Sequence, residues 1–265
     1  MNNNSNILPF LIIIFFLIYT LKKFGVLNYL DTILISRKTK QELKDFYSKQ
    51  LNYFNSLPYK DRDRFVIRAN KLKKSIHIIG KNDFKVTEEV RLLSIAAQVQ
   101  LTFGFNQFFL NKFHTILIYP DTYESKLTGK MHYGEVNPRG IIVISWDRFL
   151  KGYTIPNDKI NLGLHEMAHA LMHTIICSSD HEDGLDKYLR DIVRLSKIKI
   201  EKIKNGENHL YRKYAGANIY EFFAVSVEHF FEAPDELKLE LPALYQYLTK
   251  LLKQDPTIGL FHLKK

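Results

Sequence analysis

The chain has 265 residues, of which 46% are apolar and 13% aromatic, so an intrinsically disordered chain is excluded and a core of ordinary size is available. The formal net charge is +10, which invites a nucleic-acid interpretation. The lysines and arginines are spread along the chain without a recognition motif, however, so we expect no nucleic-acid partner.

An apolar run occupies residues 7–21 and is followed by Lys22 and Lys23. The run is shorter than the roughly 17–25 residues of a usual membrane helix, but snorkelling lysines and local bilayer thinning can close that gap. A cleaved signal peptide would carry its positive charge before the run and small residues after it, which favours an uncleaved anchor here. The positive-inside rule then predicts a single-pass cell-membrane protein whose remaining chain faces the cytoplasm.

We expect the chain to consist of an N-terminal apolar segment and one domain. No internal repeat or low-complexity linker divides that domain. Residues 1–35 form an N-terminal tail, the anchor helix and a juxtamembrane segment, and residues 36–265 form one domain. Hydrophobic spacing predicts helices over 40–57, 61–74, 87–103 and 187–204, and strands over 114–119 and 140–146. Residues 76–86 are irregular or strand-like, and residues 121–139 are rich in loops.

The pattern HExxH runs from His165 to His169. In a helix, these two histidines lie one turn apart on the same face and can bind one metal ion. Glu166 is then the neighbouring carboxylate that can activate a metal-bound water. The apolar residues around the motif favour a helix, and either Asp158 or Asn161 can cap its N-terminus.

A catalytic zinc typically takes three protein ligands, so the motif needs one more. The metzincin class is excluded because Ile175 stands where its third histidine would be. His173 is a poor alternative, because three histidines down one helix do not easily close a tetrahedron. The remaining solution is a glutamate on a later helix, and residues 217–232 carry Glu221 and Glu228 on one face. Spacing alone does not separate these two glutamates.

The motif HEMAH and the later segment Glu-Phe-Phe-Ala-Val-x-x-Glu-x-Phe-Phe-x-Ala-Pro resemble the zinc peptidases related to Mlc titration factor A. The catalytic domain of anthrax lethal factor carries a similar glutamate helix. Further similar motifs are Leu57-Pro58, Thr87-Glu88-Glu89, Ile118-Tyr119-Pro120 and Val143-Ile144-Ser145-Trp146. The resemblance covers roughly residues 42–257, and the N-terminal apolar run lies outside it.

The resemblance implies an α+β, zincin-like metallopeptidase domain that is mostly helical with a small sheet. It implies one Zn²⁺ per chain, bound by His165, His169 and Glu221, whereas Glu228 supports the site from outside. Tyr214 would donate a hydrogen bond to the oxyanion. Many relatives have an aspartate where this chain has Met172, which removes one partner for a ligand histidine.

These observations predict a zinc-dependent peptidase that hydrolyses peptide bonds of a peptide or protein substrate, with Glu166 assisting the attack of water. If the strand at 141–145 is an edge beside the cleft, it could hold the substrate extended. The alternative is a membrane-tethered zinc-fold binding protein that recruits a regulatory protein. The single cysteine, Cys177, excludes an intrachain disulfide and fits a reducing compartment, and we expect its side chain to be buried.

Overall fold

The computed structural model describes most of the chain between residues 35 and 259. The described ranges are 9, 12–16, 19–20, 35–110, 112–126, 128–155, 157–177, 184–207 and 210–259. The anchor expected at residues 7–21 falls partly outside these ranges, and most of the juxtamembrane segment does so too. Among the described residues, no helix is both long and apolar enough to cross a bilayer. The membrane anchor and the division of the chain at residue 35 therefore stay predictions.

Helices make up most of the described chain. In order they are α3 (Arg37–Gln50), α4 (Asn52–Ser56), α5 (Tyr59–Ser75), α6 (Glu88–Leu101), α7 (Trp146–Thr154), α8 (Leu162–Cys177), α9 (Leu185–Lys204), α10 (Ile219–Glu232), α11 (Pro234–Glu240) and α12 (Pro242–Leu252), with the 3-10 turns η2 (Lys213–Gly216) and η3 (Pro256–Ile258). The strands are β1 (His77–Gly80), β2 (Thr115–Tyr119), β3 (Tyr123–Glu124), β4 (Met131–His132), β5 (Gly134–Asn137) and β6 (Ile141–Ser145). The prediction of a mostly helical α+β protein with a small sheet is confirmed.

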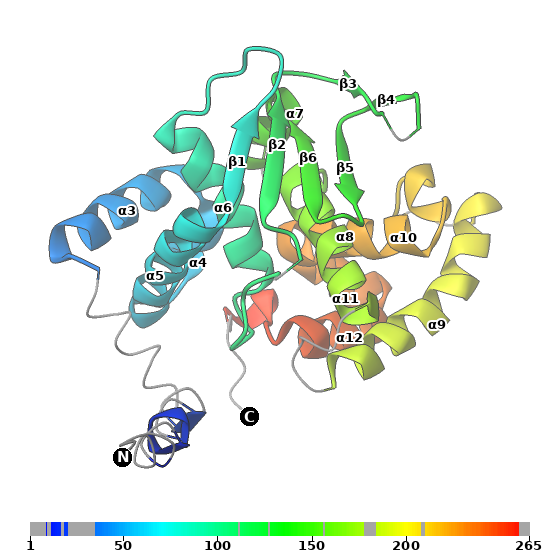
Figure 1. The fold of residues 1–265 in the computed structure, drawn as a ribbon. Coiled ribbons are helices and arrows are strands. Elements are labelled where there is room, and N and C mark those ends of the chain that lie inside the picture. The colour runs from blue at the N-terminus through cyan, green and yellow to red at the C-terminus, as the bar shows by residue number, and fades with distance from the viewer. Residues whose placement is uncertain are drawn as a thin grey trace, which may run out of the picture.

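The main sheet has the strand order β1-β2-β6-β5. The first three strands are parallel, and β5 pairs antiparallel with β6, so that Glu135 lies opposite Val143 and Val136 opposite Ile142. In Figure 1, α3 and α5 lie on the β1 side of the sheet, and α9 and α10 lie beyond β5. Strands β3 and β4 form a separate two-stranded sheet.

The condition for substrate binding along residues 141–145, that they form an edge strand, is not met. This segment is β6, which lies between β2 and β5 inside the sheet. Ile142, Val143 and Ile144 are all buried, which agrees with the unbroken hydrophobicity of the segment. The free edge on this side of the sheet belongs to β5.

Helix α8 lies at the centre of the domain, because it contacts β5, β6, α6, α7, α9 and α10. Helix α10, which packs against α8, carries several aromatic side chains. Three of them, Phe222, Phe223 and Phe230, are fully buried. Truncating such a phenylalanine to alanine typically costs about 3–5 kcal/mol of stability. The relative position of α8 and α10 is therefore held by a rigid part of the core.

Two element boundaries differ from the prediction. The helix expected over 40–57 is interrupted at Leu51, which adopts an extended conformation (φ −128°, ψ 112°) and is buried in the core. Residues 146–154, for which no helix was expected, form α7. Cys177 also differs, because it is the exposed last residue of α8 and does not point into the core.

Candidate metal centre

The helix that carries HExxH is capped by Asn161. The Leu164 backbone N–H donates a hydrogen bond of 3.0 Å to Asn161 Oδ1, which satisfies one of the free donors of the first turn of α8. Asp158, the other candidate cap, instead accepts a hydrogen bond from the Ile160 N–H within the preceding loop. The structure thus decides between the two caps that the sequence left open.

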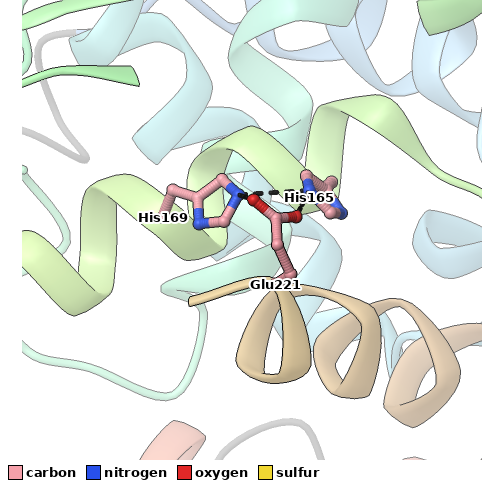
Figure 2. A group of neighbouring side chains, drawn as sticks. All are labelled: His165, His169 and Glu221. Carbon is pink, nitrogen blue, oxygen red and sulfur yellow. Dashed lines mark hydrogen bonds and ion pairs between the residues drawn. The ribbon is translucent and has the colours of Figure 1, made fainter. Parts of the chain in front are cut away.

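His165, His169 and Glu221 come together where α8 passes α10 (Figure 2). His165 Nε2 lies 3.1 Å from Glu221 Oε2 and 3.1 Å from His169 Nε2. His169 Nε2 lies 3.6 Å from Glu221 Oε1. The structure therefore selects Glu221 over Glu228 as the glutamate that faces both histidines.

This arrangement fits a zinc ion. Bonds of about 2.0–2.1 Å to a tetrahedral zinc place neighbouring ligand atoms about 3.3 Å apart. The three separations between His165, His169 and Glu221 scatter around that value. Two imidazoles and one carboxylate are also the donor set of a catalytic zinc that keeps its fourth position open.

The electrostatics of the cluster are those of a site that attracts positive charge. Burial disfavours a charged His165, but hydrogen bonds with Glu221 and Glu228 outweigh burial and raise its pKa to about 10. Burial would raise the pKa of Glu221, but the two histidines hold it well below its usual range. Without a metal ion the cluster thus pairs an ionised Glu221 with a protonated His165, and a divalent cation would take the place of the proton on His165 Nε2.

Glu228 orients one of the two histidines. His165 Nδ1–H donates a 2.7 Å hydrogen bond to Glu228 Oε1, and this leaves Nε2 to face Glu221. Arg212 Nη2 donates to the same oxygen at 2.9 Å, and the Asn161 backbone N–H donates to Glu228 Oε2 at 2.6 Å. Because Glu228 is almost fully buried, its position is fixed, and with it the tautomer and ring orientation of His165.

Glu166 lies beside the three ligands but bonds to none of them. It is buried, and its Oε2 has no hydrogen-bond partner among the described residues. Burial raises its pKa, which suits a carboxylate that must accept a proton. Gly134 lies against its carboxyl group, because a Cβ at that position would overlap with Oε1 and lie 2.8 Å from Cγ.

Tyr214 lies in η2, at the rim of the site. Its ring centroid is 6.0 Å from that of His165, and just over half of the residue is exposed. Burial of part of the ring, together with the nearby Glu221, raises the pKa of the phenol, so the hydroxyl keeps its proton at neutral pH. The structure therefore places a hydrogen-bond donor next to the candidate metal ligands.

A cavity of about 410 Å³ opens in front of these residues. Its far wall comes from β5 and the residues next to it, including Gly134, Glu135 and Val136, which the sequence alone did not single out. The alternation of Gly134-Glu135-Val136-Asn137 before a turn at Gly140 was the available signal. His173, the weak third-ligand candidate, lines the cavity but does not belong to the cluster.

Glu135 is a further acidic group in this cavity. Its Oε2 is buried and accepts no hydrogen bond from the described residues. It lies near Tyr123, whose pKa is raised by burial and then by Glu135 and Glu166. The cavity thus contains, besides Glu166, a second carboxyl group that does not belong to the candidate metal cluster.

Comparison with known proteins gives an independent result. A family model described as glucose-regulated metallo-peptidase M90 matches residues 28–253. The chain is 27% identical over 234 residues to a Synechocystis protein, Uncharacterized protein slr2042, which covers 79% of this chain and 82% of that protein. It is 30% identical over 169 residues to Mlc titration factor A of Yersinia pestis and of Yersinia pseudotuberculosis. This match covers 56% of the chain and 60% of the length of those relatives.

Proposed function

Because the chain belongs to the glucose-regulated metallopeptidase family M90, we propose that it is a zinc-dependent peptidase in which Glu166 assists the attack of water on a peptide bond. The observation that carries the proposal is the cluster of His165, His169 and Glu221. It faces a cavity into which the unpartnered carboxylate of Glu166 also points. Family membership supports a metallopeptidase in general, and the geometry supports zinc and these particular residues.

Each residue of the site has one task in this proposal. His165, His169 and Glu221 would hold Zn²⁺, one ion per chain, which would lower the pKa of a water molecule and polarise the substrate carbonyl. Glu166 takes a proton from the attacking water and passes it to the leaving amine. Tyr214 donates a hydrogen bond to the oxygen that becomes negatively charged.

The substrate would bind along β5. This strand pairs with β6 on one side only, and it forms the cavity wall that faces the metal ligands. An extended peptide can add to such an edge through backbone hydrogen bonds. A Val136→Pro variant should therefore raise KM for peptides, and an unchanged KM in a folded variant would contradict this binding mode.

The proposal is tested by metal content and hydrolysis in the same preparations. We expect about one zinc per wild-type chain after dialysis and clearly weaker retention in Glu221→Ala. Glu166→Gln should retain zinc and lose peptide hydrolysis. A folded wild-type protein without bound zinc would refute the metallopeptidase mechanism, and zinc retention in Glu221→Ala would move the third ligand elsewhere.

A second candidate function is recruitment of a regulatory protein by a membrane-tethered zinc fold. The name of the Yersinia relatives, Mlc titration factor A, favours it. Glu166→Gln separates the two functions, because it should abolish hydrolysis and spare partner binding. The anchor at residues 7–21 and a cytoplasm-facing domain remain predictions from the charge pattern of the N-terminal residues.

A further inference from the structure

A second cavity, of about 300 Å³, lies away from the metal centre and shares no lining residue with the cavity described above. Its walls come from seven segments: α4, α6, α7, the loop before α8, the end of α10, the start of α11, and η3. The volume is at the lower end of the range of small-molecule sites. The catalytic proposal makes no use of this cavity.

Two buried polar atoms in its walls have no hydrogen-bond partner among the described residues. They are Glu232 Oε2 and Tyr153 Oη. The two groups are close enough for Glu232 to raise the pKa of the tyrosine, yet they do not bond to each other. Leaving a buried polar atom without a partner costs about 1–3 kcal/mol, so both atoms favour a ligand that completes their hydrogen bonds.

The negative charge of the cavity is concentrated at Glu232, whereas Arg64 and Arg68 lie close enough to act on Tyr53 in another part of the wall. Glu232 is the only carboxylate in its lining, which contains no lysine, arginine or histidine. Asp158 and Glu228 add negative potential at Glu232. Lys159, which lies between the lining residues Asn157 and Asn161, forms an ion pair with Glu236. A cation would therefore be attracted to the end of the cavity at Glu232.

The other walls suit an organic cation. The rings of Tyr53, Tyr153 and Phe231 line the cavity, and those of Tyr53 and Phe231 meet edge to face at 5.8 Å. Aromatic faces attract ammonium groups through their quadrupoles. Pro234 and Pro256 add apolar surface that fits an alkyl chain.

We propose that this cavity binds a small organic cation whose primary ammonium group donates hydrogen bonds to Glu232 Oε2 and Tyr153 Oη. Burial raises the pKa of Glu232 to about 7, and a bound ammonium would relieve that burial penalty by neutralising the carboxylate. The cavity is linked to the helix that carries the candidate metal ligands through Asn161, whose Nδ2 donates a 3.0 Å hydrogen bond to Glu232 Oε1. The same residue caps α8 and contacts Glu228. The proposal does not depend on peptidase activity.

The probe is n-butylammonium chloride, titrated calorimetrically at pH 8 into the full-length chain. n-Butanol serves as the neutral control of the same length, and sodium chloride as the ionic-strength control. We expect saturable binding of the ammonium and none of the alcohol. Glu232→Gln should weaken this binding at least tenfold, and Tyr153→Phe should weaken it about threefold.

Glu240→Gln is the matched control, because it removes the same charge from an exposed position on α11 outside the cavity. It should bind the probe like the wild type. Circular dichroism checks that each variant is folded, and Tyr153→Phe gives a second test if Glu232→Gln fails to fold. No saturable binding to the wild type, equal binding of butanol, or unchanged affinity in both folded cavity variants would overturn the proposal.

Discussion

The most informative substitution is Glu228→Gln, because it changes three hydrogen bonds and almost no volume. The wild-type carboxylate accepts from His165, Arg212 and the Asn161 backbone N–H. In glutamine an NH2 group, which only donates, replaces one of the two carboxylate oxygens. It must therefore turn a donor either toward the Asn161 N–H or toward His165 and Arg212.

The magnitude follows from these contacts. Hydrogen bonds to charged groups contribute about 1.5–3 kcal/mol each, so the metal-free variant should lose about 2–3 kcal/mol of unfolding free energy. The loss of the partner that orients a metal-binding histidine typically weakens metal binding 10–100-fold, which equals about 1.4–2.8 kcal/mol. Both losses are expected together, because Glu228 is buried beside His165.

The assay is competition for zinc with a chelator of known affinity, combined with urea unfolding of the metal-free protein. Glu240→Gln controls for the loss of one negative charge. If Glu228→Gln unfolds more easily but binds zinc with wild-type affinity, the reasoning is refuted. Glu228 would then stabilise the fold without orienting the metal ligand.

Three more substitutions test other parts of the structure. Gly134→Ala should displace the Glu166 carboxyl and lower kcat at least tenfold while zinc content stays near one per chain, as metal analysis and peptide assays would show. Asn161→Ala removes the cap of α8 and should lower the free energy of unfolding by about 1 kcal/mol or more in urea, whereas zinc affinity should change little, because alanine keeps the backbone N–H that donates to Glu228. Glu232 has a folded pKa of about 7 against an ordinary value of 4.5, so the folded state holds this proton longer than the unfolded state. The free energy of unfolding should therefore fall by up to about 3 kcal/mol as the pH rises from about 4.5 to 7, and Glu232→Gln should remove that part of the slope.

The sequence was most informative where one helix determines the geometry. HExxH places His165 and His169 on one face by helical periodicity alone, and the structure has them there. The choice between Glu221 and Glu228 could not follow from periodicity, because residues seven apart share a face. Which of them faces the histidines depends on how α10 crosses α8. That crossing is set by packing between segments far apart in the chain.

Local signals also explain the errors. Leu51 fits the helical pattern of its neighbours, but burial in the core holds it in an extended conformation that ends α3. Helix α7 could have been predicted, because Trp146, Phe149 and Tyr153 repeat at helical spacing. The hydrophobic strand pattern directly before it overlaps the start of the helix at Trp146. The position of β5 depends on strand order, which is a tertiary property. Strand hydrophobicity alone therefore could not show that β6 is an interior strand.

The two sides of the metal cavity come from separate stretches of the chain. All three candidate ligands lie on α8 and α10, whereas the facing wall comes from residues 132–138. The short strands and turns of residues 121–140 are tied to the helical core mainly through the pairing of β5 with β6. The sequence of this stretch can therefore vary without moving the candidate ligands, provided that Gly134 beside Glu166 is kept. Chimeras that swap this stretch between family members but keep Gly134 should transfer peptide preference and retain the candidate metal site.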